Sequence, residues 1–160
     1  TIYAGLSPDG SVKMFTTRCD AGQTWDGSNC TGTRSTITWN NGTGNWTDAG
    51  AYSSISGESN SAALDILVDT AAPYEAAEYC ESLNISGHTD WYLPAINELK
   101  MLYDSLAVIR NFNTSGYWYW SSTQAGIAYA QSKRFSDGIE AIGGYSPEKR
   151  ASNLVRCVRR

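Results

Sequence analysis

The stretch Leu154-Val155-Arg156-Cys157-Val158-Arg159-Arg160 closes the chain and has the pattern of a short final strand built around a cysteine. Its counterpart is Cys80, which lies far upstream in the amphipathic helical pattern Ala76–Leu83. Ala76, Cys80 and Leu83 fall on one stripe of that helix, which turns Cys80 toward the core. A helix and a distant terminal strand are therefore candidates for one covalent bond, which would imply an oxidising compartment.

The four cysteines allow three pairings. We favour Cys19–Cys30, which closes a short loop and makes a knob of residues 18–34, together with Cys80–Cys157, which closes a long loop. On chain entropy the two bonds would contribute about 3 and about 4–5 kcal/mol. The alternative is four free thiols. No two cysteines are spaced as C-x-x-C and there is one histidine, so we expect no metal site of the zinc type.

The composition is that of a loop-rich extracellular protein with a folded core. Aromatic residues make up 12% of the sequence and charged residues 18%. A chain of 160 residues is long enough for one real core, so residues 1–160 are expected to form a single domain. No apolar run reaches 18 residues, so we expect no membrane insertion. The chain begins abruptly in a strand-like segment, which suggests a mature or excised piece of a longer protein. We expect an extracellular location and no nucleic-acid partner.

The pattern of elements predicts an α+β fold. Two helices are expected, from about Ala72 to Leu83 and from after Pro94 to about Ala107. Residues 40–61 are expected to form a long loop, and the apolar run 63–68 could be either helix or strand. The expected strands are 1–6, 11–17, 36–39, 117–122, 128–135, 139–142 and 153–159. No βαβ alternation occurs, which favours a small antiparallel sheet.

Local motifs point to a family. Gly87-His88-Thr89-Asp90-Trp91-Tyr92-Leu93-Pro94, followed by Asn97-Glu98-Leu99, resembles the G-x-T-D-W-x-L-P-x-x-x-E-L signature of the Lcl C-terminal (DUF1566) domain family. The strand Tyr119-Trp120-Ser121-Ser122-Thr123 and the segment Phe135-Ser136-Asp137-Gly138 are similar to later elements of that family. The resemblance implies a C-type-lectin-like fold, with two helices packed on a small twisted antiparallel sheet, long loops and two disulfides.

The resemblance also implies a function. The family is named after a collagen-like surface adhesin of Legionella, in which the domain caps a collagenous stalk, is expected to form homotrimers and binds sulfated glycosaminoglycans. We therefore expect an extracellular adhesion domain at the bacterial cell surface. It would recognise sulfated glycosaminoglycan or another anionic polysaccharide without a metal ion or cofactor. Calcium-dependent lectins use Glu-Pro-Asn or Gln-Pro-Asp with Trp-Asn-Asp, and none of these triplets occurs here. Asp137 and Glu140 are too few oxygen donors for calcium.

Basic residues gather late in the chain. Residues 110–160 hold eight basic and three acidic side chains, which gives +5. Arg and Lys meet sulfates and carboxylates, and a cluster would steer a polyanion. The candidate basic patch consists of Lys133, Arg134, Lys149, Arg150 and Arg160. Arg156 and Arg159 are instead expected to form structural ion pairs.

Aromatic side chains could stack on sugar rings. The candidates are Tyr117, Tyr119, Tyr129 and Tyr145. Because strand residues alternate between two faces, we expect Trp120 to be buried and Tyr117 or Tyr119 to be exposed. Trp91 is expected in the core.

Two other functions stay open. The first is a protein-binding receptor module that contacts a host surface protein through the variable loops Gln124–Tyr129 and Ile142–Pro147; an apolar surface there would favour it. The second is an enzyme related to the formylglycine-generating enzymes, which need free active-site cysteines. The sequence indicates no nucleophile that would pair with His88, and it contains no known catalytic motif. We therefore expect no catalytic residues and expect that the protein is not an enzyme.

Overall fold

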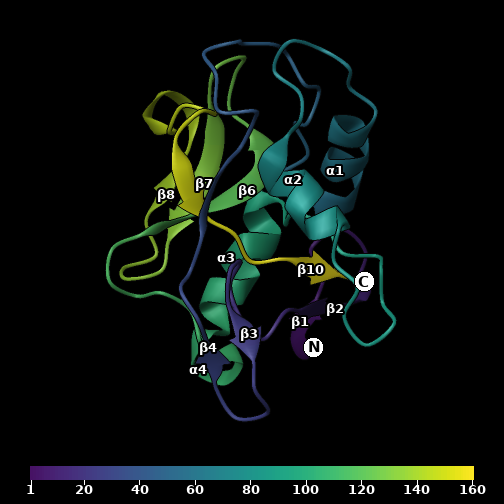
Figure 1. Ribbon diagram of the computed structural model, residues 1–160, viewed down its shortest axis with the longest axis vertical. Helices are drawn as coiled ribbons and strands as arrows, with labels where there is room; N and C mark the ends of the chain where they lie inside the picture. Colours follow the sequence, from purple (N-terminus) through teal and green to yellow (C-terminus); the bar gives the residue numbers. More distant parts are fainter.

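A small sheet brings the two ends of the chain together. The computed structural model describes residues 1–160, and its first sheet has the order β1-β2-β10, made of β1 (Ile2–Leu6), β2 (Lys13–Thr16) and β10 (Val158–Arg159). Both outer strands run antiparallel to β2, and Thr16 is paired with Ile2 on one side and with Val158 on the other. The N- and C-termini consequently lie at the same end of the molecule (Figure 1).

A second sheet forms the centre of the fold. Its order is β5-β9-β6-β7-β8, made of β5 (Thr36–Thr38), β9 (Ser152–Leu154), β6 (Trp118–Gln124), β7 (Ala130–Arg134) and β8 (Glu140–Ala141). All neighbours are antiparallel except β6 and β9, which run parallel at Tyr119 and Leu154. The strand predicted over residues 153–159 is therefore wrong as one element. It is split into β9 and β10, which belong to different sheets.

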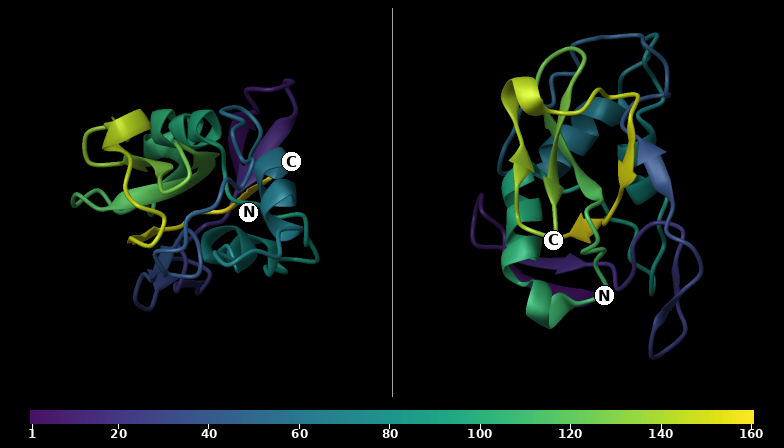
Figure 2. Two further views of the ribbon diagram at one scale, coloured as in Figure 1. Left: turned by 90° about the horizontal axis from the view of Figure 1, so that it is seen from above. Right: turned by 90° about the vertical axis from the view of Figure 1, so that its left-hand side faces the viewer.

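Helices cover both faces of this sheet, as two views show (Figures 1 and 2). Residues of α2 (Glu75–Glu81) pack with Trp120 in one core cluster, which also holds Trp39 and Trp91. Leu99 and Leu102 of α3 (Ile96–Asp104) pack with Tyr119 in a second cluster on the other face. The two predicted helices are confirmed with shorter bounds, and a short α4 (Leu106–Ile109) follows α3.

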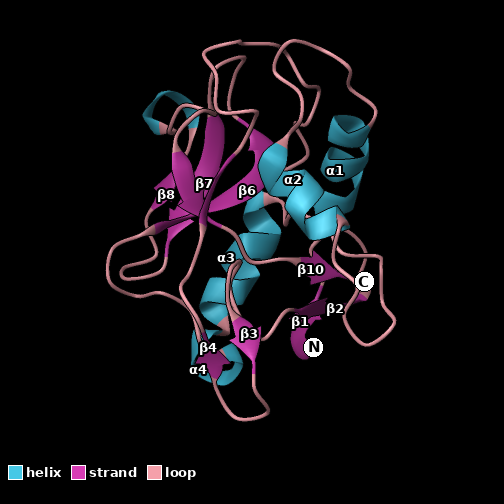
Figure 3. Cartoon of the chain, in the orientation of Figure 1, coloured by secondary structure: helices cyan, strands magenta, loops and turns pink.

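A further helix replaces part of the predicted long loop. α1 (Gly57–Asp65) begins inside the segment 40–61, so the prediction of a loop there is wrong at its C-terminal end. The Ser56 side chain accepts a hydrogen bond from the Ser59 N–H and caps the helix. Gly57 packs so closely that an added Cβ would lie 2.4 Å from the Leu93 carbonyl oxygen. The rest of the segment is an extended loop, drawn in pink at the top of Figure 3.

Both predicted disulfides are confirmed. Cys80 and Cys157 are bonded with an S–S distance of 2.05 Å, and both are buried. Cys19 and Cys30 close the knob around the hairpin of β3 (Thr24–Trp25) and β4 (Cys30–Thr31). The fold is thus α+β with two disulfides, as expected, whereas the C-type-lectin-like assignment stays a prediction. No helix has the length and apolar character needed to cross a membrane.

Candidate functional site

Two of the predicted basic residues are buried, so the expectation that they lie on a binding surface is wrong. The Lys133 side chain on β7 is 4% exposed and donates to Glu140 Oε1 at 2.9 Å and to the Gly138 carbonyl at 2.8 Å. Lys149 is fully buried. Neither ammonium group can reach a polyanion in solvent without breaking these contacts.

The exposed predicted cations are paired with nearby carboxylates. Arg134 forms a two-bond contact with Asp137, which holds the pKa of that carboxyl below its usual range. Arg150 Nε lies 2.7 Å from Glu148 Oε2, and the Arg150 guanidinium lies 5.8 Å from the Trp46 ring centroid. These pairs leave little uncompensated positive charge at the predicted patch.

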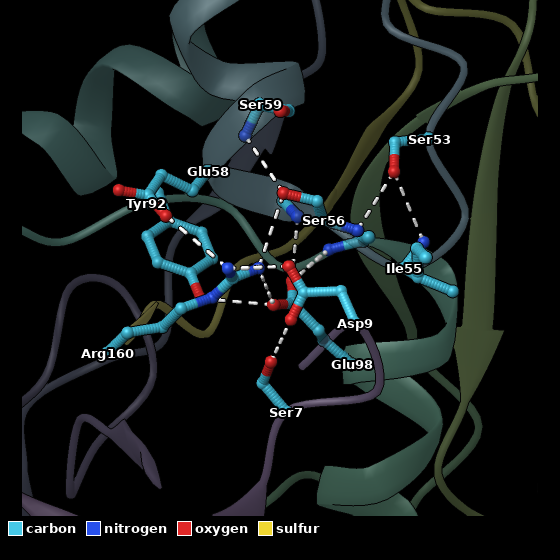
Figure 4. A network of polar contacts seen from close by, with 12 residues as sticks. Ser7, Asp9, Ser53, Ile55, Ser56, Glu58, Ser59, Tyr92, Glu98 and Arg160 are labelled. Carbon is cyan, nitrogen blue, oxygen red and sulfur yellow. Dashed lines mark hydrogen bonds and ion pairs between the residues drawn. The ribbon is translucent and has the colours of Figure 1, made fainter. Parts of the chain in front are cut away.

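Arg160 belongs to a structural network at the other end of the molecule (Figure 4). Its guanidinium contacts Asp9 at 2.6 Å and Glu98 at 3.1 Å, and donates to the Tyr92 hydroxyl at 3.0 Å. Glu98 is fully buried, and burial raises its pKa against the opposing effect of its hydrogen bonds. Glu98 Oε2 accepts from the N–H groups of Gly57 and Ala95, both at 2.9 Å.

This network explains the Asn97-Glu98-Leu99 part of the motif. The single carboxylate of Glu98 accepts hydrogen bonds from a backbone N–H group at the start of α1 and from a backbone N–H group at the start of α3. It also holds the terminal Arg160 against both helices. Arg160 therefore has a structural role, and it does not lie near the other predicted cations.

The predicted aromatic residues divide in the same way. Of Tyr117 and Tyr119, only Tyr117 is exposed, which agrees with the expectation for this strand. Tyr119 is fully buried, so its prediction as a sugar-stacking residue is wrong. Its hydroxyl donates to Asp20 Oδ2 at 2.7 Å and accepts from the Asn113 N–H at 2.6 Å. Tyr117, Tyr129 and Tyr145 are 55%, 39% and 93% exposed, which leaves them accessible. Trp120 and Trp91 are in the core as expected.

Asp20 joins the knob to the end of the chain, a role that the sequence did not indicate. Its Oδ1 accepts from Arg156 Nε at 2.7 Å, and its Oδ2 accepts from Arg34 Nε at 2.6 Å. Arg156 also donates to the Thr17 carbonyl at 2.8 Å. The expectation that Arg156 is structural is confirmed. Arg159 likewise pairs with Asp90, at 3.2 Å.

The two loops Gln124–Tyr129 and Ile142–Pro147 form one continuous area, which we call the loop surface. They are held together by the backbone bonds Ala130 N–H to Pro147 carbonyl, at 3.2 Å, and Lys149 N–H to Ala128 carbonyl, at 2.9 Å. Neither loop contains a charged residue. Large apolar side chains are exposed on both: Ile127 at 56%, Tyr129 at 39%, Ile142 at 49% and Tyr145 at 93%. Their concentration on two adjacent loops marks this area as a candidate for binding.

The loop surface lies far from the chain termini. The short 3₁₀ turn η1 (Gly143–Tyr145) and the loop after β6 are at one end of the molecule, whereas the N- and C-termini are toward the other (Figures 1 and 2). The loop 40–52 lies beside it, since Gln124 Nε2 donates to Asp48 Oδ1 at 2.8 Å and Arg150 contacts Trp46.

A cleft of about 450 Å³ separates the knob from α2. Tyr79, Leu83, Ile85 and Val155 are among the apolar side chains of its walls. At its edge the Arg18 guanidinium lies 4.8 Å from the Trp25 ring centroid. Asn111 contacts the base of the knob, where its side-chain amide donates to the Arg18 carbonyl at 3.5 Å and its own carbonyl accepts from Arg34 Nη2 at 3.2 Å. Arg110 directly precedes Asn111 in the sequence. No ion pair involves Arg18 or Arg110.

No free cysteine remains in the chain. The thiol nucleophiles that a formylglycine-generating enzyme needs are therefore tied up in disulfides. His88 lies 4.0 Å from Asp90 and 3.2 Å from Arg159, with no hydroxyl among its hydrogen-bond partners.

A comparison with protein families matches residues 17–159 to the model described as the Lcl C-terminal domain. The match spans the knob, all the helices and eight of the ten strands, β3 to β10. No curated protein matches the chain.

Proposed function

Because this chain belongs to the Lcl C-terminal domain family, which suggests a surface adhesin-like domain, we propose that it is an extracellular adhesion domain that binds a protein on another surface through its loop surface. The observation that supports this proposal is the exposure of Ile127, Tyr129, Ile142 and Tyr145 on two adjacent loops without a charged residue. Tyrosine is enriched among the residues that contribute most binding energy, and the centre of an interface is more apolar and less charged than its rim.

The rigidity of the loops supports this choice. The loops are short and lie directly on β6, β7 and β8, so few bonds must be frozen when a partner binds. Ser146, in the second loop, is buried and donates to the Ala141 carbonyl at 3.0 Å, which fixes the turn that carries Tyr145. If three copies assemble, as we also propose, modest contacts of each would combine through avidity.

Cell binding of labelled variants tests the proposal. The double variant Ile142→Ser/Tyr145→Ser should lower binding to cultured epithelial cells by about tenfold or more, because hot-spot side chains contribute above 1.4 kcal/mol each. Val108→Ser is the matched control, since Val108 is 76% exposed on α4 and lies outside the loop surface. Trypsin treatment of the cells should remove binding and heparinase treatment should leave it unchanged.

Two results would contradict the proposal. One is equal binding by the double variant and the wild type. The other is binding that survives trypsin treatment of the cells and disappears after heparinase treatment, which favours the polysaccharide instead.

A sulfated glycosaminoglycan is the second candidate ligand. It is favoured by the cations at the base of the knob, where Arg18 and Arg110 are exposed and have no acidic partner. Arg18 also lies over Trp25, which would offer a ring face to a sugar beside the charge. In this case the polyanion would bind at the base of the knob and not at the basic patch predicted from the sequence.

A further inference from the structure

Lys149 is a buried lysine without a counter-ion. Its ammonium nitrogen donates to Gln124 Oε1 at 2.6 Å and to the Thr47 carbonyl at 3.1 Å, and it lies 4.7 Å from the Trp39 ring centroid. The other buried lysine, Lys133, has the carboxylate of Glu140 at 2.9 Å. Burial lowers the pKa of Lys149 to about 8, although the negative charges of Asp48 and Asp69 oppose this effect.

The side-chain amide of Gln124 is held in one orientation. Its Oε1 accepts from Lys149 Nζ and from the Ala49 N–H at 2.9 Å, while its Nε2 donates to Asp48 Oδ1 at 2.8 Å. A flipped amide would lose all three contacts, so the carbonyl faces the amine and the amide nitrogen faces the carboxylate. Gln124 and Lys149 are both almost completely buried.

This arrangement contains the parts of an acyl transfer. A neutral amine is a nucleophile, and desolvation favours the neutral form of a lysine. The Ala49 N–H points at the oxygen on which negative charge would develop. The carboxylate of Asp48 contacts the nitrogen that would leave. Water has little access to Gln124 and Lys149, so hydrolysis of the Gln124 amide does not compete with attack by the amine.

We propose that Lys149 and Gln124 join in an intramolecular isopeptide bond, with release of ammonia. Nζ of the neutral Lys149 amine attacks Cδ of Gln124 and gives a tetrahedral intermediate whose oxyanion is Oε1. One proton passes from Nζ to Nε2, and the Asp48 carboxylate, which accepts a hydrogen bond from Nε2, stabilises the positive charge that this proton brings to the leaving nitrogen. The Cδ–Nε2 bond then breaks, and ammonia leaves with the two hydrogens of the former amide and the transferred proton. No oxidant, reductant or cofactor is consumed.

The bond would fasten the base of the loop surface. Gln124 is the last residue of β6, and Lys149 lies just before β9. Both loops of the loop surface lie between these two residues in the sequence, so the cross-link would close them into one covalent ring. The proposal stands apart from the identity of the partner, because the bond can form whatever the loops bind.

The mass of the reduced protein tests the proposal. Wild-type chain is expected to be lighter than its sequence by the mass of one ammonia. The variants Lys149→Met and Gln124→Met should have full mass, and Asp48→Asn should lose ammonia more slowly. Lys100→Met is the matched control, because Lys100 is exposed and pairs with Asp104; this variant should lose ammonia like the wild type.

Peptide mapping of the wild type locates the bond, even if a variant does not fold. An isopeptide at Lys149 blocks trypsin there, so residues 111–133 should be recovered as a branched peptide joined to residues 135–150. A succinimide at Asn41-Gly42 also loses ammonia but gives no branched peptide. Full mass after prolonged incubation, or separate peptides 111–133 and 135–149, would overturn the proposal.

Discussion

The guanidinium of Arg156 and the carboxylate of Asp20 form a fully buried ion pair, with Nε 2.7 Å from Oδ1. Arg156 lies between β9 and β10, and Asp20 lies inside the Cys19–Cys30 loop of the knob, so the pair joins the last segment of the chain to its first disulfide loop. A buried pair adds little net stability as a whole, but removing one member leaves the other charge without a partner.

Asp20→Asn should therefore destabilise the fold by about 3–5 kcal/mol, since it leaves Arg156 and Arg34 without their carboxylate. Urea unfolding followed by tryptophan fluorescence measures the change. Glu75→Gln removes an exposed carboxylate of α2 and should stay within about 0.5 kcal/mol of the wild type. A loss for Asp20→Asn as small as that of the control would show that the pair is dispensable.

The two disulfides should differ in their effect on stability. Replacing Cys80 and Cys157 by alanine opens a loop with a sequence separation of 77, and should cost about 4–5 kcal/mol on chain entropy. Replacing Cys19 and Cys30, separated by 11, should cost about 3 kcal/mol. Thermal unfolding of both double variants tests the order. The reverse order would mean that the knob carries more of the fold than the helix-to-strand bond.

Glu81 should make the fold less stable as the pH rises. Burial, and then the charges of Asp65 and Glu78, raise the pKa of Glu81 from 4.5 to about 7. Because this carboxyl binds its proton more tightly in the folded state, the free energy of unfolding falls as the pH rises from 4.5 to about 7. Because Glu81 is only partly buried and solvent screens its charge, Glu81→Gln should gain only roughly 1 kcal/mol at pH 8. At pH 4 the variant and the wild type should unfold alike; melting curves at both pH values check this.

Heparin chromatography should separate the two sets of arginines. If a polyanion binds, Arg18→Gln/Arg110→Gln should elute at lower salt than the wild type, because both side chains are exposed and unpaired. Arg134→Gln/Arg150→Gln should elute near the wild type, since each arginine already has an acidic partner. If only Arg134→Gln/Arg150→Gln eluted at lower salt, the basic patch predicted from the sequence would be the binding site after all.

The sequence was sufficient for features that depend on local pattern. The stripe of Ala76, Cys80 and Leu83 predicted the helix and the direction of its cysteine, and both are confirmed. α1 was missed because its segment is rich in Ser, Asn and Gly, which are weak helix formers. Its start depends on Glu98, 41 residues away, and a local pattern does not show such a partner.

The candidate site was less predictable, because it depends on what surrounds each side chain. Alternation predicted that Tyr119 and Trp120 would face different environments, but β6 is covered by helices on both faces, so both are buried. The partners of Arg134 and Arg150 are two or three residues away and could have been found. The burial of Lys149 beneath the loop 40–52 could not.

The pairing of Thr16 with both Ile2 and Val158 has a practical consequence. It places the two ends of the polypeptide near each other, on the side of the molecule away from η1, the turn that carries Tyr145 (Figure 1). An affinity tag, a fluorophore or a biosensor chip can be attached through either end, and the exposed tyrosine will still project away from the support.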